Sequence, residues 1–158
     1  MFREIRRFKQ ALSEEKCKEI LENEKRGVLS VLVDNDYPYG LPINHYYDKE
    51  NHRLFFHGGK SGHRVDAVNK HNKVSFCVYD QGYRKEGDWA LNISSVIVFG
   101  KLMPVEDREL AMKLCRDLCY KFTQDQDYIE HEIQSSGKNT LVYELVIEHM
   151  SGKLVNEA

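Results

Sequence analysis

The sequence has 158 residues, of which 41% are hydrophobic, and its 23 lysines and arginines nearly balance its 25 aspartates and glutamates. A chain of this length can bury one continuous core, so we expect a single domain over residues 1–158. The balanced charge excludes a strong general attraction to nucleic acid or to an acidic membrane, and neither is an expected partner.

The charged beginning of the sequence does not read as a secretory signal. The segment "MFREIRRFKQALSEEK" is charged and has no apolar core of the ~7–15 residues that a secretory signal needs. No run approaches ~18 uninterrupted apolar residues, so no membrane helix is expected. The cysteines lie inside apolar patterns, which suits thiols in a reducing compartment. We therefore expect a soluble, cytoplasmic protein.

The first third of the chain predicts a helix followed by a β-hairpin. Ser13 can cap a helix over about residues 13–26, with two glutamates in its first turn and an apolar stripe before Gly27. The β-branched segment "GVLSVLVD" predicts a strand over 27–34, and "NDYPYG" leads to a second strand, "LPINHYYD", over 41–48. The turn residues between them favour antiparallel pairing.

The middle of the chain predicts further strands around a short helix. "LFFH" reads as a strand and the run after Gly62 as a short helix, followed by a strand "KVSFCVYD" and a polar loop "QGYRKEGDW". In the next strand, about 91–99, Ile97 and Phe99 share one face, while Val96 and Val98 make the other face apolar too. We expect the second half of this strand to be buried on both sides.

The last third predicts the clearest helix and a final strand. Leucines recur every four residues from Leu110 to Leu118, and Phe122 follows, which indicates an amphipathic helix over about 107–122. "TLVYELVIEHM" alternates apolar and polar residues, as is typical of an antiparallel strand over about 140–150. About six strands with only two or three helices favour a small antiparallel barrel with flanking helices.

The segment "HGGKSGHR", residues 57–64, combines glycines with basic side chains at the start of a predicted helix. Backbone N–H groups, cationic side chains and the positive end of the helix all favour an anion there. The spacing matches neither the P-loop nor the dinucleotide fingerprint. Charge and glycine alone leave two readings equally open, a phosphate cradle and an ordinary turn with hydrated basic residues.

Metal and hydrolase chemistry are less favoured. The sequence contains several histidines, among them His45, His52, His57, His63 and His71. They form no HExxH motif and no CxxC motif accompanies them, so no metal site is expected. There is no GxSxG elbow, and Cys77 lies in the middle of a strand pattern. An enzyme of this kind would depend on a cofactor for its chemistry.

The ordered segments resemble the FMN-binding split-barrel proteins related to pyridoxamine 5'-phosphate oxidase, in the branch of the nitroimidazole-resistance (Nim) reductases. The likeness runs through "GVLSVLVD", "PYGLPINHYYD", "LFFHGGKSGHRVDAVNKHNKVSFCVYD", "SSVIVFGKL" and "YELVIEHMSGKLV". It implies a mainly β fold with flanking helices, a six-stranded antiparallel Greek-key split β-barrel. It also implies a homodimer with one FMN in each of two clefts between the subunits.

The resemblance also nominates site residues. "LPIN" is similar to the strand beside the flavin ring, which points to Pro42, Ile43 and Asn44. "HGGKSGHR" is similar to the phosphate and ribityl segment, and Ser95 matches a position near the flavin. The residues nominated from that segment are His57, Gly58, Lys60, His63 and Arg64. His57 is the candidate catalytic residue, with strand capping and phosphate contact as its other reading.

The implied activity is that of a Nim-like, FMN-dependent oxidoreductase, in which an electron donor reduces the flavin and a small acceptor such as a nitro compound reoxidises it. Two alternatives stay open. One is a flavin- or haem-binding protein without turnover, with His45, His57 or His63 as iron ligands, or a deazaflavin-binding one. The other is a pyridoxamine phosphate oxidase, which would need a second phosphate site, and no second basic cluster is evident on a strand.

Overall fold

The computed structural model describes residues 1–157, so Ala158, the last residue of the expected domain, lies outside the described residues. The strands in this part of the chain are β1 (Arg26–Leu32), β2 (Pro38–Asp48), β3 (Arg53–Gly59), β4 (Lys73–Tyr79), β5 (Tyr83–Arg84), β6 (Leu91–Pro104) and β7 (Thr140–Asn156). The α-helices are α1 (Glu14–Asn23), α2 (His63–Lys70), α3 (Arg108–Tyr120) and α4 (Gln126–Ser136). Three short 3₁₀ turns are η1 (Phe8–Gln10), η2 (Asp34–Asp36) and η3 (Gly137–Asn139).

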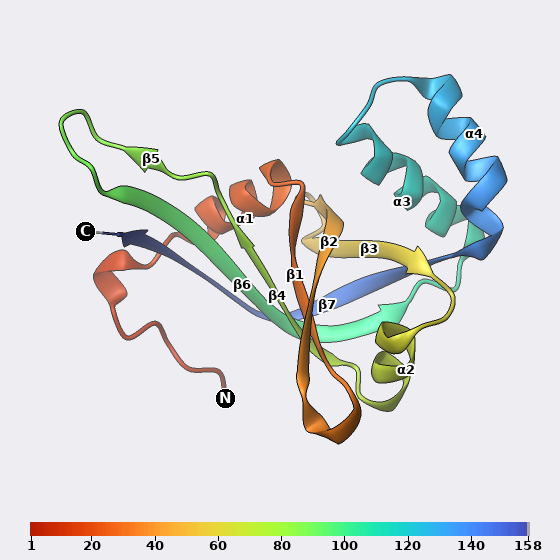
Figure 1. The fold of residues 1–158 in the computed structure, drawn as a ribbon, viewed down its shortest axis with the longest axis horizontal. Helices are drawn as coiled ribbons and strands as arrows, with labels where there is room; N and C mark the ends of the chain where they lie inside the picture. The colour runs from red at the N-terminus through yellow and green to blue at the C-terminus, as the bar shows by residue number, and fades with distance from the viewer. Residues whose placement is uncertain (158) are drawn as a thin grey trace.

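The strands form one antiparallel sheet in the order β4-β1-β2-β3-β7-β6-β5, and β4 pairs with β6 as well as with β1. The six longer strands thus curve around a common core, as Figure 1 shows. The barrel is split because β2 and β3 share only four residue pairs, the last of them His45 with Phe56. Beyond that pair, β2 continues along β1 alone, which leaves space between the ends of β2 and β3.

The expected mainly β fold with flanking helices is confirmed, but the expected count of six strands is wrong. The seventh strand is β5, two residues that pair with Asn92 and Leu91 of β6. It lies in the segment expected to be a polar loop. Two residues are too few to produce an alternating pattern, so this strand depends on the long β6 beside it.

Alternation along the strands builds the main core. Leu29, Phe56, Phe76 and Val98 point inward from different strands and are fully or almost fully buried. The helix α1 covers one opening of this core with Cys17, Ile20 and Leu21. A second cluster forms where the other face of β3 packs against α3, and its members are Phe55, Ala111, Leu114, Cys115 and Val142. Figure 1 shows α3 and α4 together beside β3, at the end of the molecule away from β5.

Several expected boundaries shift. The first helix ends at Asn23 and not near residue 26, because Glu24 is already extended. The long helix ends at Tyr120, and a fourth helix, α4, follows it where none was expected. The last strand extends to Asn156 and not to about residue 150, because its end pairs with the beginning of β6. These extensions depend on long-range pairing, which local patterns do not contain.

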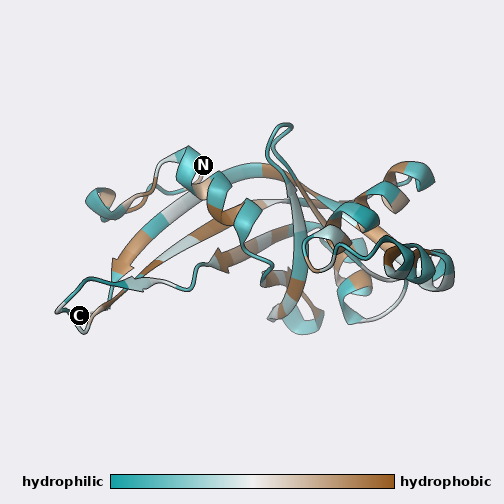
Figure 2. Cartoon of the chain, turned by 90° about the horizontal axis from the view of Figure 1, so that it is seen from above, coloured by the Kyte–Doolittle hydropathy of each residue, from teal (hydrophilic) through white to brown (hydrophobic). Residues whose placement is uncertain are grey.

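The expectation that the second half of the strand at about 91–99 is buried on both sides is wrong within the single chain. Val96 and Val98 are buried, but Ile97 and Phe99 on the opposite face are 39% and 38% exposed. Neighbouring strands add to this outer face, since Ile97 pairs with Cys77 of β4, which in turn pairs with Val28 of β1. Figure 2 shows that brown, apolar residues are concentrated on the strands, while the helices are largely teal.

Among the residues described, none of the helices combines the length and the apolar character needed to cross a bilayer.

Candidate functional site

The parting of β2 and β3 creates a hollow of about 290 Å³ lined by Arg26, Pro42, Ile43, Asn44 and His57. Four of the sequence-predicted residues therefore meet there. Pro42 and Asn44 lie on the outer side of β2, because the residues that alternate with them turn toward the core. Pro42 gives the hollow an apolar side chain, Asn44 an amide, His57 an imidazole and Arg26 a cation, while the side chain of Ile43 packs against the core. Such a set suits a flat ring with polar edges.

Gly58, which follows His57 in the chain, lies against the guanidinium of Arg64. A Cβ built on Gly58 would overlap the guanidinium and would stand only 2.7 Å from Nη1 and 2.8 Å from Cζ. The guanidinium also lies over the ring of Tyr143, with Cζ 5.7 Å from the ring centroid. Its Nε is buried and has no hydrogen-bond partner among the described residues. A glycine and an arginine with an unused donor thus form a cradle suited to an anion.

The other predicted phosphate residues do not converge on this point. Lys60 is exposed and lines a neighbouring hollow of about 410 Å³, which Tyr143 also lines. His63 is exposed, with Nε2 3.7 Å from Asp34 Oδ2 and its ring 5.3 Å from that of Tyr39. Within the described chain, no side chain caps the start of α2 at Gly62. Arg64 and Lys60 therefore flank Tyr143, while His63 turns toward the β1–β2 turn.

Ser95 lies apart from these hollows. It pairs with Tyr79 of β4 and with Lys153 of β7, on the same outer face as Ile97 and Phe99. Within one chain it does not come together with His57.

His57 is half-buried at the mouth of the hollow. Burial lowers the pKa of its imidazole, and the positive charge of Arg64 lowers the pKa further. Since the ordinary value is already below neutral, the ring is neutral at pH 7. A neutral imidazole can donate one hydrogen bond and accept another, and an anion bound beside it would favour its protonated form.

The two neighbours that follow "PIN" point to opposite sides of β2. His45 is fully buried, with Nε2 2.7 Å from the Leu21 carbonyl oxygen, while Tyr46 faces α3. Burial, with the charge of Lys121, lowers the pKa of His45 to about 3. His45 thus lies in the core and lines neither of the two hollows described above. Among the described residues, no group of three or more histidines, cysteines or acids could hold a metal ion.

Sequence reasoning did not identify Arg26 as a site residue. Its Nε donates a hydrogen bond to Asn44 Oδ1 at 3.0 Å, across the pair that Arg26 forms with Asn44. The available signal was its position, since a basic dipeptide directly precedes the apolar strand "GVLSVL".

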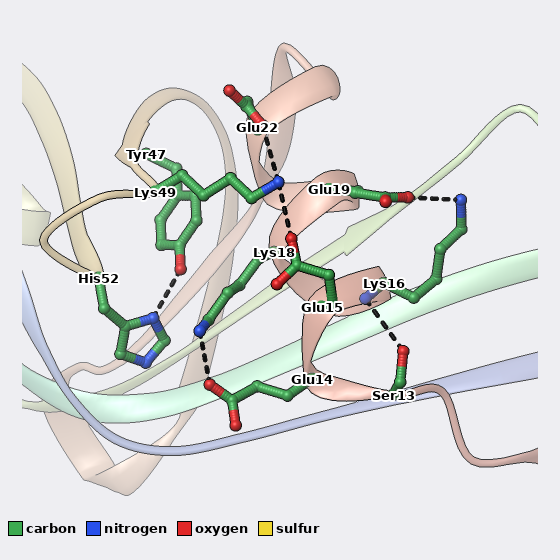
Figure 3. A network of polar contacts seen from close by, with 10 residues as sticks. All are labelled: Ser13, Glu14, Glu15, Lys16, Lys18, Glu19, Glu22, Tyr47, Lys49 and His52. Atoms are coloured by element: carbon green, nitrogen blue, oxygen red, sulfur yellow. Dashed lines mark hydrogen bonds and ion pairs between the residues drawn. The ribbon is translucent and has the colours of Figure 1, made fainter.

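A polar network links α1 to the turn that follows β2, the strand that carries Pro42 and Asn44 (Figure 3). Lys49, in the turn after β2, forms ion pairs with Glu15 and Glu22 of α1. Tyr47 Oη lies 2.6 Å from Nδ1 of His52 in the same turn. The site is therefore built on a strand that is anchored at its far end.

Comparison with known proteins decides the family. The family described as pyridoxamine 5'-phosphate oxidase matches residues 13–154, nearly the whole chain. The chain belongs to the pyridoxamine 5'-phosphate oxidase family. No curated protein matches the sequence.

Solved structures support the fold of this family member. A candidate 5-nitroimidazole antibiotic resistance protein from Bacteroides thetaiotaomicron is 18% identical, with a TM-score of 0.76 over 92% of this chain and 87% of that one. A FAD-binding protein from Mesorhizobium loti is 20% identical, with a TM-score of 0.67 over 92% and 97%. A FAD- and haem-binding protein from Mycobacterium smegmatis is 18% identical, with a TM-score of 0.66 over 95% and 74%. At these identities the likeness establishes the fold alone.

Proposed function

We propose that this protein is a flavin-dependent oxidoreductase that binds FMN and reduces a small acceptor such as a nitro compound. The observation that carries the proposal is the cradle of Gly58 and Arg64, beside a hollow with an apolar floor. The buried, unpartnered Nε of Arg64 supports an anionic ligand there. FMN combines a flat ring with a phosphate of nearly two negative charges, which matches both parts of the site.

Each residue has a definite role in this proposal. Arg64 binds the phosphate, Pro42 supports the ring, and Asn44 binds its polar edge, while Lys60 lines the neighbouring hollow. The flavin, when bound, supplies the electron transfer. His57 orients the ligand through its neutral imidazole and serves as a proton donor only when a bound anion raises its pKa.

The proposal includes a homodimer with the flavin in a cleft between subunits. Its support is the apolar outer face of β1, β4 and β6, where Val28, Ile97 and Phe99 are each more than a third exposed. Ser95 lies on this face and would approach a flavin that extends across the interface. The four cysteines are free thiols, which supports a reducing compartment such as the cytoplasm.

A first experiment separates the cofactors and the classes of function. The purified protein is titrated with FMN, FAD, riboflavin, a deazaflavin and haem, and its absorbance is recorded. We expect FMN to bind more tightly than riboflavin, and FMN reduced in the protein to be reoxidised by a nitro compound. Haem binding alone, seen as a Soret band, would contradict the proposal. FMN binding without reoxidation by any acceptor would indicate a binding protein without turnover.

The cradle has a test with a matched control. In Gly58→Ala the new methyl group displaces the flexible guanidinium of Arg64, so the fold stays intact while phosphate binding weakens. We expect FMN affinity to fall about tenfold or more and riboflavin affinity to change little, because a charge-assisted hydrogen bond contributes ~1.5–3 kcal/mol. Gly59→Ala, whose Cβ has its nearest contact at 3.9 Å, is the control. Equal FMN affinity in both variants would place the phosphate elsewhere.

A further inference from the structure

The basic pair Lys25 and Arg26 lies at the start of β1, beside two adjoining hollows. Arg26 lines the hollow that contains His57. It also lines a second hollow of about 530 Å³, which extends past Val28 to Tyr79. Pro42 borders both hollows. The pair therefore stands where a second molecule would approach a flavin held beside His57.

Lys25 and Arg26 both make a cation–π contact with the ring of Phe122. Lys25 Nζ lies 5.4 Å and Arg26 Cζ 5.8 Å from the centroid of the Phe122 ring. Asn44 fixes the guanidinium by accepting from Nε at 3.0 Å. In the described part of the chain, neither cation forms an ion pair. A guanidinium fixed through Nε keeps its Nη donors for a ligand, and two parallel donors match a carboxylate or phosphate.

The surroundings favour an anion on this side. Among residues 1–157, no acidic residue lines the hollow of His57, and the acidic residue that lines the second hollow is Glu24. Burial raises the pKa of the Glu24 carboxyl and the charge of Asp80 raises it further, while the charge of Lys121 lowers it. Tyr79, Val28 and Pro42 supply aromatic and apolar surface beside the cations. The combination suits an aromatic molecule with an acidic group.

We propose that Arg26, assisted by Lys25, binds an acidic group of the molecule that exchanges electrons with the flavin. The inference rests on the proposed function and narrows its substrate class to acids. The acidic group can belong to either of two molecules. It is a carboxylate or phosphate if it belongs to the electron acceptor, and a pyrophosphate if it belongs to a nicotinamide donor. In either case Arg26 is a specificity-determining residue outside the phosphate cradle.

The test compares charged with neutral probes by equilibrium binding. Calorimetry measures 4-nitrobenzoate and the neutral 4-nitrobenzyl alcohol on the purified protein, with and without FMN. A second arm compares NADH with the uncharged donor N-benzyl-1,4-dihydronicotinamide. The variants are Arg26→Gln, Lys25→Gln and Arg26→Lys. The control is Arg84→Gln, since Arg84 is an exposed arginine of β5 that donates to the Trp89 carbonyl oxygen.

We expect the wild type to prefer the charged member of one pair by about ten- to hundredfold, as one charge-assisted contact implies. Arg26→Gln should abolish this preference and Lys25→Gln reduce it, Arg26→Lys should retain part of it, and Arg84→Gln should have no effect. If the protein prefers 4-nitrobenzoate to its alcohol, the acidic group belongs to the acceptor. If it prefers NADH to the uncharged donor, the acidic group is the pyrophosphate of the donor.

Other outcomes overturn the proposal. It is wrong if the preference persists in Arg26→Gln, if the wild type prefers neither charged probe, or if Arg26→Gln weakens FMN binding itself, which would make Arg26 a flavin ligand. Failure of the wild type to bind any flavin would defeat the proposed function alone. The preference of the flavin-free protein for 4-nitrobenzoate, and its loss in Arg26→Gln, would still decide the role of Arg26.

Discussion

At the scale of single residues, alternation along β2 decides which side chains face a ligand and which are structural. Pro42 and Asn44 face outward, whereas His45 is enclosed beside the Phe76 ring, with centroids 5.0 Å apart. Its Nε2 is close to the Leu21 carbonyl oxygen and its Nδ1 is buried without a partner among the described residues. His45 therefore contributes to pH-dependent stability and not to the site.

Replacing His45 by Gln should flatten the loss of stability in acid. The unfolded imidazole takes up a proton below its ordinary pKa of 6.5, whereas the folded one does so only near 3, so acidification favours the unfolded state over this interval. Well below pH 6.5, the free energy of unfolding falls by about 1.4 kcal/mol for each unit by which the pH is lowered. Urea unfolding between pH 7.5 and 4.5 measures the slope, with the exposed His131→Gln as control. A slope unchanged by His45→Gln would contradict this account.

At the scale of elements, local sequence predicts the long helix better than the short one after it. The apolar stripe of α3 is wide, whereas α4 buries Ile129 alone and has a narrow stripe. The sequence does contain a helix-capping residue, Asp125, whose carboxylate accepts a hydrogen bond from the Tyr128 N–H at 3.0 Å at the start of α4. Arg116 of α3 also pairs with Glu130 of α4, with Nη2 2.9 Å from Oε2. Packing and this pair stabilise a helix that propensity alone leaves weak.

The strand β1 depends on a glycine where it crosses the core. A Cβ on Gly27 would stand 2.6 Å from Phe76 Cε2, and the aromatic ring is enclosed on all sides. Gly27→Ala should therefore lower the free energy of unfolding by about 1–3 kcal/mol, the usual effect of overpacking. Urea denaturation without ligand measures this free energy, and Gly59→Ala, where a Cβ has space, is the control. Equal stabilities of the two variants would show that Phe76 moves aside freely.

At the scale of the whole molecule, the outer face of the barrel is unusually apolar for a surface. Val28, Tyr79, Ile97 and Phe99 are exposed to between 37% and 57%, and Phe2 stacks on Phe99 with centroids 5.6 Å apart. The cross-strand row from Val28 through Cys77 to Ile97 makes the face continuous. An extended apolar face of this kind is typical of a surface covered by a partner, and a second copy is the partner that we propose.

Placing a charge on this face should separate the subunits. We expect the wild type to sediment as a dimer with two flavins, and Ile97→Asp as a monomer with much weaker flavin binding, since burying an unpaired carboxylate at an interface is costly. Tyr128→Asp, on the exposed side of α4, should leave the dimer intact. Analytical ultracentrifugation with flavin absorbance makes the comparison. A flavin-loaded monomer of the wild type would contradict the shared cleft.

The amino-acid pattern by itself determined the β-rich class, the long strands and the basic glycine turn, because alternation, β-branching and glycine act over a few residues. It placed His57, Gly58 and Arg64 in one segment, but it could not tell a cradle from an ordinary turn. Only the tertiary structure decided that Arg64 folds onto Gly58 while His63 turns toward Asp34. It also brought Arg26 beside Asn44, a contact between residues distant in the chain that depends on the register of β1 and β2.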